Sequence, residues 1–186
     1  MPQLAQMPLL SVADYLAGED GAEVRHEYIA GQVYAMSGAS RSHGLIALNI
    51  ATFLRPRLRG TGCQLFASGM KVRLRIQGDD IFYYPDLLLS CDPADRATYY
   101  CTAPCLLVEV LSESTAALDR REKFWAYRTL PSLREYLLVA QDRTWARIHR
   151  RDRDWAPEIV ESGAVRLDCL DCELPLDVVY EDLALG

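Results

Sequence analysis

Lysine and long apolar runs are scarce in this sequence of 186 residues. Lys71 and Lys123 are the only lysines, so arginine supplies nearly all of the positive charge. Because a lysine ammonium is compact and its pKa shifts readily on burial, each of the two is a candidate for a specific role. No run of roughly 18 apolar residues is present, which excludes a membrane-spanning helix.

The N-terminus lacks the basic segment and long apolar stretch of a signal peptide. We therefore expect a cytoplasmic protein in which the six cysteines are reduced. Cys169 and Cys172 form a C-x-x-C pair, and Cys101 precedes Cys105 by four positions. A zinc site or a redox pair is conceivable on this spacing, but buried free thiols are the interpretation that we favour.

The net charge of −6 argues against a protein that coats nucleic acid without specificity. Any contact with nucleic acid must then come from arginines gathered on one part of the surface. The candidates lie around a predicted long helix and on one face of a predicted strand: Arg41, Arg55, Arg57, Arg59, Arg73 and Arg75. The alternative is a solvated basic face with no ligand.

The spacing of apolar residues predicts a mixed α+β (α/β) domain over residues 11–186, after a flexible tail over residues 1–10. Helices are expected over residues 12–17, 43–59, 115–130 and 176–183. Strands are expected over residues 25–30, 33–36, 63–67, 70–76, 86–90, 105–111, 135–140, 144–149 and 155–161, and a loop over residues 92–103.

Two acids lie inside apolar runs that read as strands. Asp86 follows Pro85 in YYPDLLLS, and Glu109 lies in LLVEVLS. A buried carboxylate without a partner costs several kcal/mol, so each acid needs a cation, a donor network or a metal. Hard oxygen ligands suit Mg²⁺ or Mn²⁺. The simpler alternative is that both acids lie at solvated strand ends.

An acid after proline on one strand and a second acid on a later apolar strand resemble the PD-(D/E)xK nuclease superfamily. The sequence is more narrowly similar to the Uma2 family. The stretches that carry this resemblance cover about residues 11–140 and read HEYIAGQVYAMSG, YPDLLLS, LLVEVLSEST, DRREKFWAY and LREYLLVA. The resemblance implies a restriction-endonuclease-like fold, in which helices flank a mixed central sheet, and metal-dependent cleavage of nucleic acid, with DNA expected.

The sequence departs from the superfamily motif at one position. Leu111 stands two residues after Glu109, where the superfamily has lysine. By resemblance to Uma2 chains, Lys123 from the next helix replaces it. Asp119, Lys123 and Tyr127 are spaced four apart and share one helical face. An ion pair between Lys123 and Asp119 on the surface is the alternative.

The resemblance also assigns roles to residues outside the two central acids. Glu27, in the HEY stretch, is expected to lie near the metal, although an acid at a hairpin edge would look the same. His43 begins the long helix and is expected near the substrate phosphate, unless it is only a helix cap. Substrate contacts are thus assigned to Arg41, His43 and Tyr127.

The resulting hypothesis is a hydrolase in which Glu27, Asp86, Glu109 and Lys123 are catalytic. Asp86, Glu109 and the Val110 backbone carbonyl would hold one Mg²⁺ (or Mn²⁺), and Lys123 would orient the attacking water. Two other classes remain open: a catalytically silent nucleic-acid-binding or protein-interaction domain, and a metal-dependent hydrolase of small phosphoesters. A homodimer is expected only by analogy with other chains of this fold.

Overall fold

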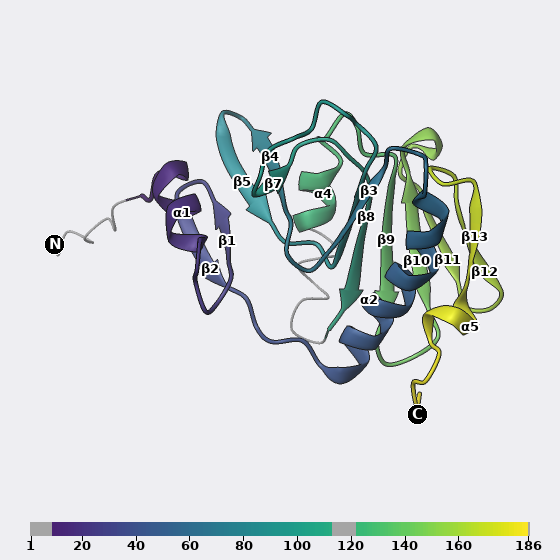
Figure 1. Cartoon of the computed structure of the whole chain (residues 1–186). Helices are drawn as coiled ribbons and strands as arrows, with labels where there is room; N and C mark the ends of the chain where they lie inside the picture. Colours follow the sequence, from purple (N-terminus) through teal and green to yellow (C-terminus); the bar gives the residue numbers. More distant parts are fainter. Residues whose placement is uncertain (1–8, 113–121, 186) are drawn as a thin grey trace, which may run out of the picture.

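Two β-sheets lie side by side at the centre of the structure, a computed structural model that describes residues 9–112 and 122–185 (Figure 1). The first sheet has the strand order β2-β1-β5-β4-β7 and the second the order β11-β10-β9-β8-β6-β3. The first consists of β1 (His26–Ile29), β2 (Gln32–Ala35), β4 (Lys71–Ile76), β5 (Asp79–Tyr83) and β7 (Tyr100–Cys101). The second consists of β3 (Gln64–Ala67), β6 (Leu87–Ser90), β8 (Pro104–Leu111), β9 (Glu135–Ala140), β10 (Ala146–Arg150) and β11 (Pro157–Val160).

Both sheets mix parallel with antiparallel pairing. β8 and β9 are parallel neighbours in the second sheet, and β4 and β7 are parallel in the first. The remaining neighbours are antiparallel, including a separate hairpin of β12 (Ala164–Leu167) and β13 (Cys172–Pro175). The protein therefore has the mixed α+β fold that the sequence predicted.

Helices cover the outer face of each sheet and also fill the space between the two sheets (Figure 1). Residues of α1 (Val12–Glu19) pack on the outer face of the first sheet, where Tyr15 meets Tyr28 and Phe82. Between the sheets, α4 (Phe124–Tyr127) buries Ala126 and Tyr127. The outer face of the second sheet carries α2 (Arg41–Leu54), the short helix η1 (Arg55–Leu58) and α5 (Leu176–Val179).

The side chains of β8 alternate between two cores, one on each face of the second sheet. Leu106, Val108 and Val110 face the core formed with α2, α5 and the C-terminal hairpin. Leu107 and Leu111 face the core between the two sheets. Since neighbouring strand residues point to opposite faces, a continuous apolar run is the pattern of such a central strand. Glu109 interrupts that run on the side between the sheets.

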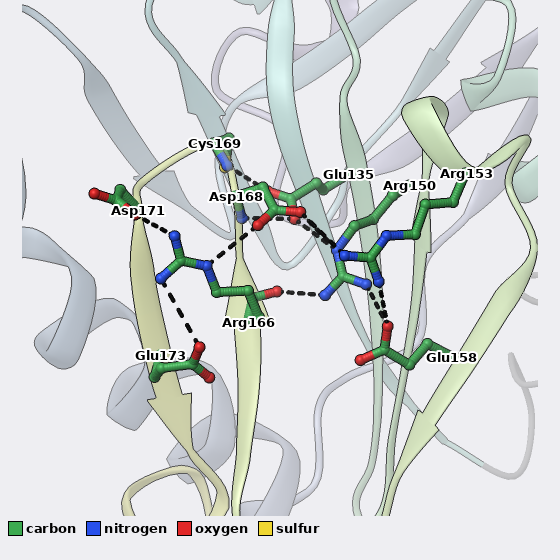
Figure 2. A network of polar contacts seen from close by, with 9 residues as sticks. All are labelled: Glu135, Arg150, Arg153, Glu158, Arg166, Asp168, Cys169, Asp171 and Glu173. Atoms are coloured by element: carbon green, nitrogen blue, oxygen red, sulfur yellow. Dashed lines mark hydrogen bonds and ion pairs between the residues drawn. The ribbon is translucent and has the colours of Figure 1, made fainter.

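A network of ion pairs joins the C-terminal hairpin to the second sheet (Figure 2). Arg150, at the end of β10, is 2% exposed, and all three of its guanidinium nitrogens donate. They reach Glu135 at 3.3 Å, Glu158 at 2.6 Å and the Arg166 carbonyl at 2.6 Å. Glu135 also accepts from the backbone nitrogens of Asp168 and Cys169. We call Glu135, Arg150, Glu158, Arg166 and Asp168 the Arg150 network.

Several predicted elements differ from those observed. Gly78, Asp79 and Asp80 have the composition of a turn, and the sequence predicts one there. The observed turn lies at Gln77 and Gly78, and the two aspartates begin β5, which pairs with both β4 and β1. The predicted loop over residues 92–103 contains β7, and the hairpin β12–β13 was not predicted. The long helix begins at Arg41 because Ser40 accepts from the His43 backbone nitrogen, and it tightens into η1 at Pro56. The last helix ends at Val179.

The ends of the chain and the third predicted helix are only partly described. Residues 113–121, and Asp119 with them, lie outside the described residues, as do residues 1–8 of the predicted tail. The last two residues of that predicted tail are held: the Leu10 backbone nitrogen donates to the Gly31 carbonyl at 2.9 Å. Within residues 9–112 and 122–185, no helix has both the length and the apolarity needed to cross a bilayer.

The prediction of six reduced cysteines is wrong for Cys63 and Cys91, which form a disulfide. These residues flank the paired ends of β3 and β6, where Gln64 lies opposite Ser90, so the strand register brings their sulfurs together. Cys101, Cys105, Cys169 and Cys172 are free thiols.

Candidate active site

The two central acids lie opposite each other at the junction of the two sheets. Asp86 immediately precedes β6, in the segment that carries the chain from β5 in the first sheet to the second sheet. The antiparallel register pairs Leu87 with Val108, so the next pair along the ladder is Asp86 with Glu109. Directly opposed residues project from the same face of a sheet, here the face between the sheets.

Both oxygens of the Asp86 carboxylate are engaged. His43 Nε2, from the first turn of α2, lies 2.7 Å from Asp86 Oδ1, and the Val110 backbone nitrogen donates to Oδ2 at 2.7 Å. The observed contact of Val110 is thus its N–H, on the residue that follows Glu109. These contacts fix the position of Asp86 beside β8 and bring His43 into the site.

Lys123 lies between two buried glutamates. Its ammonium is 2.9 Å from Glu27 Oε1 and 3.5 Å from Glu109 Oε1, and its side chain is only 6% exposed. Glu27 comes from β1, Glu109 from β8 and Lys123 from the residue before α4. Three segments far apart in the chain therefore converge. We call Glu27, Asp86, Glu109 and Lys123 the Lys123 cluster.

Three tyrosines surround the cluster, of which the sequence analysis identified only Tyr127. Tyr127 is completely buried and donates to Glu109 Oε1 at 2.9 Å, so it contacts the glutamate and is shielded from solvent. The Lys123 ammonium lies 5.4 Å from the centre of the Tyr83 ring. The Tyr84 backbone nitrogen donates to Glu27 at 3.4 Å. The adjacent YY of the YYPD stretch was the available signal for Tyr83 and Tyr84.

The buried position of these phenols keeps them protonated near neutral pH. Burial, with the Glu27 carboxylate adding to it, raises the pKa of Tyr83 to about 12. Burial and then the Glu109 carboxylate raise the pKa of Tyr127 well above its ordinary value. Tyr127 therefore serves as a hydrogen-bond donor to Glu109, not as a proton acceptor.

The arginines predicted to contact the substrate lie outside the Lys123 cluster. Arg41 is the first residue of α2 and is exposed, two positions before His43. Arg73, one of the arginines proposed for nucleic acid, is already paired with Asp80 at 2.9 Å. Arg57 donates to the Phe53 carbonyl and stacks on the Phe53 ring.

The donor chemistry of the Lys123 cluster fits a hard divalent cation, because three carboxylates meet there and thiolates do not. In the part of the chain that the structure describes, no three histidine, cysteine or acidic side chains are already arranged as a metal site. The Lys123 ammonium lies between the two glutamates, and His43 contacts Asp86. Metal binding would thus require the Lys123 and His43 side chains to shift relative to the carboxylates.

Comparisons with known proteins identify similar chains. The model of the Uma2 family, described as "Putative restriction endonuclease", matches residues 12–178. "Uncharacterized protein slr1290" from Synechocystis is 36% identical over 184 residues, which are 97% of this chain and 96% of that protein. "Uncharacterized protein sll1609" from the same organism is 34% identical over 144 residues, which are 76% of this chain and 80% of that protein.

Among solved structures, a crystal structure from Anabaena variabilis, described as "a putative nuclease belonging to DUF820", has a similar fold. Its TM-score is 0.70, and the match covers 86% of this chain and 91% of that one at 14% sequence identity. At this identity the likeness shows the shared fold alone.

Proposed function

Because the chain belongs to the Uma2 family of restriction-endonuclease-like proteins, we propose that it is a divalent-metal-dependent endonuclease that hydrolyses phosphodiester bonds of nucleic acid, with DNA as the expected substrate. The observation that carries this proposal is the Lys123 cluster. The Lys123 ammonium contacts Glu27 and Glu109, and Asp86 lies opposite Glu109 at the junction of the sheets. Such a concentration of buried charge is costly for folding and is typical of functional sites.

Asp86 and Glu109 are the residues that would hold Mg²⁺ or Mn²⁺, since they lie opposite each other on one face. Such an ion supplies a polarised phosphate and a more acidic attacking water. The Val110 carbonyl, the third ligand suggested by the resemblance, belongs to the residue whose N–H already holds Asp86. That N–H keeps the Asp86 carboxylate beside Glu109.

Lys123 has the chemistry to orient a water and to offset negative charge on phosphate. Its ammonium is held by Glu27 and Glu109 and lies against the Tyr83 ring, so its position is fixed before substrate binds. Prearranged cationic donors of this kind stabilise charge that develops in the transition state. Glu27 positions Lys123 through the shorter of the two contacts.

His43 and Tyr127 each contact one of the two central acids. The imidazole of His43 contacts Asp86, and as a partly exposed group it is also the side chain through which the cluster can meet a phosphate. Tyr127 is a positioning residue for Glu109. The exposed Arg41, on the same helical turn as His43, is assigned to the substrate backbone.

The test is cleavage of labelled DNA and RNA by the purified protein with Mg²⁺ or Mn²⁺. We expect Asp86→Asn and Glu109→Gln to abolish cleavage while their thermal unfolding remains cooperative. Glu161→Gln is the matched control, because Glu161 is exposed on a loop of the C-terminal part. Calorimetric titration with Mn²⁺ should detect binding to the wild type that is lost in Asp86→Asn.

Cleavage by Asp86→Asn at the wild-type rate would refute the assignment. Wild-type protein that binds DNA, but neither binds Mn²⁺ nor cleaves, would favour the catalytically silent domain. Hydrolysis of nucleotides without cleavage of oligonucleotides would favour a small phosphoester substrate.

A further inference from the structure

Lys71, the second of the two lysines, lies outside the Lys123 cluster and has no role in the proposed reaction. It is the first residue of β4 and is 6% exposed. Val72 and Leu74 of the same strand face the core between the sheets. Because strand residues alternate between faces, Lys71 and Arg73 project from the opposite face, the one that carries α1.

The Lys71 ammonium packs against two aromatic rings. It lies 5.1 Å from the centre of the Tyr84 ring and 6.0 Å from that of Tyr99. Within the described residues it takes part in no ion pair and no hydrogen bond. The nearby Glu19 carboxylate is already used, because it accepts from the His26 backbone nitrogen and the Tyr84 hydroxyl and contacts the His26 ring.

A second cation lies on the same ring. The Arg25 guanidinium is 5.8 Å from the centre of the Tyr84 ring, and Arg25 is exposed. Burial is the main cause that lowers the pKa of Lys71, and the positive charge of Arg25 acts in the same direction, against Glu19 and Asp20. Two cations share the Tyr84 ring and repel each other, while the nearby Glu19 carboxylate is already used by other donors. This arrangement favours an anion as a third partner.

The position of Lys71 and Arg25 relative to the Lys123 cluster indicates which class of anion the two cations would bind. Tyr84 precedes Asp86 by two residues, so the two lie at most about 7 Å apart along the chain. The Tyr84 backbone also contacts Glu27. The Tyr84 ring faces α1, whereas Asp86 faces the core between the sheets, but both residues lie where β5 ends. A strand of nucleic acid that crosses this end of the first sheet would meet both the cations over Tyr84 and the carboxylate that is proposed to act on the scissile phosphate.

We propose that Lys71 and Arg25 bind a backbone phosphate of nucleic acid on the same strand as, and near, the one that is cleaved at Asp86. This inference rests on the proposed function and adds to it the contact that sets the path of the strand. It also explains how an acidic chain can engage a polyanion, namely through cations that have no carboxylate partner of their own.

Arg73 provides a matched control within the same strand and face. Like Lys71 it is a cation stacked on aromatic rings, at 5.3 Å from Tyr100 and 5.6 Å from Phe82. Unlike Lys71 it is paired with a carboxylate, because its guanidinium lies 2.9 Å from Asp80. Removal of either side chain deletes one positive charge, but only Lys71 is free to neutralise a phosphate.

The experiment is a salt titration of binding to fluorescein-labelled single-stranded and duplex DNA, followed by anisotropy with Ca²⁺ in place of Mg²⁺. Each phosphate contact contributes about 0.7 to 0.9 to the slope of log affinity against log salt concentration. We expect Lys71→Met and Arg25→Ala each to reduce the slope by about this amount. Arg73→Met should keep the wild-type slope, and Lys71→Arg should restore it.

Lys71→Met is expected to fold at least as well as the wild type, since it removes a buried charge. If it fails to fold, Arg25→Ala at its exposed position decides the question alone. A wild-type slope in both variants, while the wild type binds and cleaves DNA, would overturn this inference and leave the proposed function standing. A wild type that neither binds nor cleaves either oligonucleotide would overturn both.

Discussion

The molecule holds two groups of buried charge, and they are built on different cations. In the Arg150 network, a planar guanidinium donates from all three nitrogens, and the backbone completes the set by donating two N–H groups to Glu135. In the Lys123 cluster, one ammonium contacts two glutamates, and Asp86 relies on His43 and one backbone N–H. The first group joins four strands, whereas the second lies where the two sheets and α4 meet.

The difference shows how a structural charge network can be told from a site. The guanidinium of the central arginine is planar and its donors have fixed directions, which suits a permanent connection between strands. In the Lys123 cluster, the lysine contacts Glu27 and Glu109, and Asp86 lies opposite Glu109 on the neighbouring strand, so carboxylates from three segments are near enough to be offered to an added cation. Removing the central cation should therefore have different consequences in the two places.

The largest effect on stability is expected from Arg150→Met. This substitution leaves the buried Glu135 carboxylate without its guanidinium, and breaking a buried pair from one side costs about 3 to 5 kcal/mol. Urea unfolding should show the loss as a lower midpoint. Arg153→Met is the control, because Arg153 also contacts Glu158 but is 51% exposed, and it should cost about 1 kcal/mol or less. Equal losses in the two variants would mean that Arg150 is not central to the fold.

Lys123→Met should separate the two groups most clearly. Cleavage should fall by about 10²- to 10³-fold, as when a prearranged donor to the transition state is removed. The two glutamates also lose their cation, so the protein should be less stable in EDTA. A saturating divalent cation can take over that role and should restore about 2 to 3 kcal/mol.

The measurement is thermal unfolding of Lys123→Met and Arg150→Met with EDTA and with Mn²⁺. Recovery by Mn²⁺ is expected for Lys123→Met and not for Arg150→Met. If Mn²⁺ stabilises both variants equally, or neither, the contrast between a metal-accepting cluster and a closed network fails.

Tyr127→Phe tests how much the single hydrogen bond from the Tyr127 hydroxyl contributes to holding Glu109 in place. The variant keeps the ring but loses the donor to a buried carboxylate, which costs about 1.5 to 3 kcal/mol. Cleavage should also fall, since Glu109 loses a positioning contact. Tyr28→Phe is the comparison, because its hydroxyl donates to the neutral Leu10 carbonyl. We would abandon the role of Tyr127 if the two variants lost the same stability and both retained full activity.

The smallest effect is a dependence on pH that arises at His149, which connects the two regions. It neighbours Arg150 on β10 and packs at 4.3 Å on Phe124, the residue after Lys123. Burial lowers the pKa of His149 below its ordinary value of 6.5, because the charged form is poorly solvated. The unfolded chain therefore binds a proton first as pH falls, so this stability is complete above 6.5 and is lost below it.

Unfolding midpoints of the wild type should therefore fall as the pH is lowered from above 6.5, and His149→Gln should show a shallower fall. The same pH dependence in both proteins would place the acid sensitivity at another group.

The sequence alone was enough to predict those features of the protein that depend on a local pattern of residues. Asp86 and Glu109 stood out because acids inside apolar strand runs are rare, and the family motifs extended the assignment to Glu27 and Lys123. Hydrophobic alternation also located β8 and β9. It failed at β5, where Gly78 and two aspartates read as a turn although the chain turns one residue earlier, at Gln77 and Gly78.

Tertiary structure decided which distant residues meet. Nothing in RIHRRDRD distinguishes Arg150 from the exposed Arg151 and Arg153, yet Arg150 is buried among acids from other strands. The pairing of Cys63 with Cys91 and the contact of Lys123 with Glu27 likewise depend on strand register and on the packing of α4. Local propensities act over a few residues, whereas a charge pairs with whatever the assembled sheets place beside it.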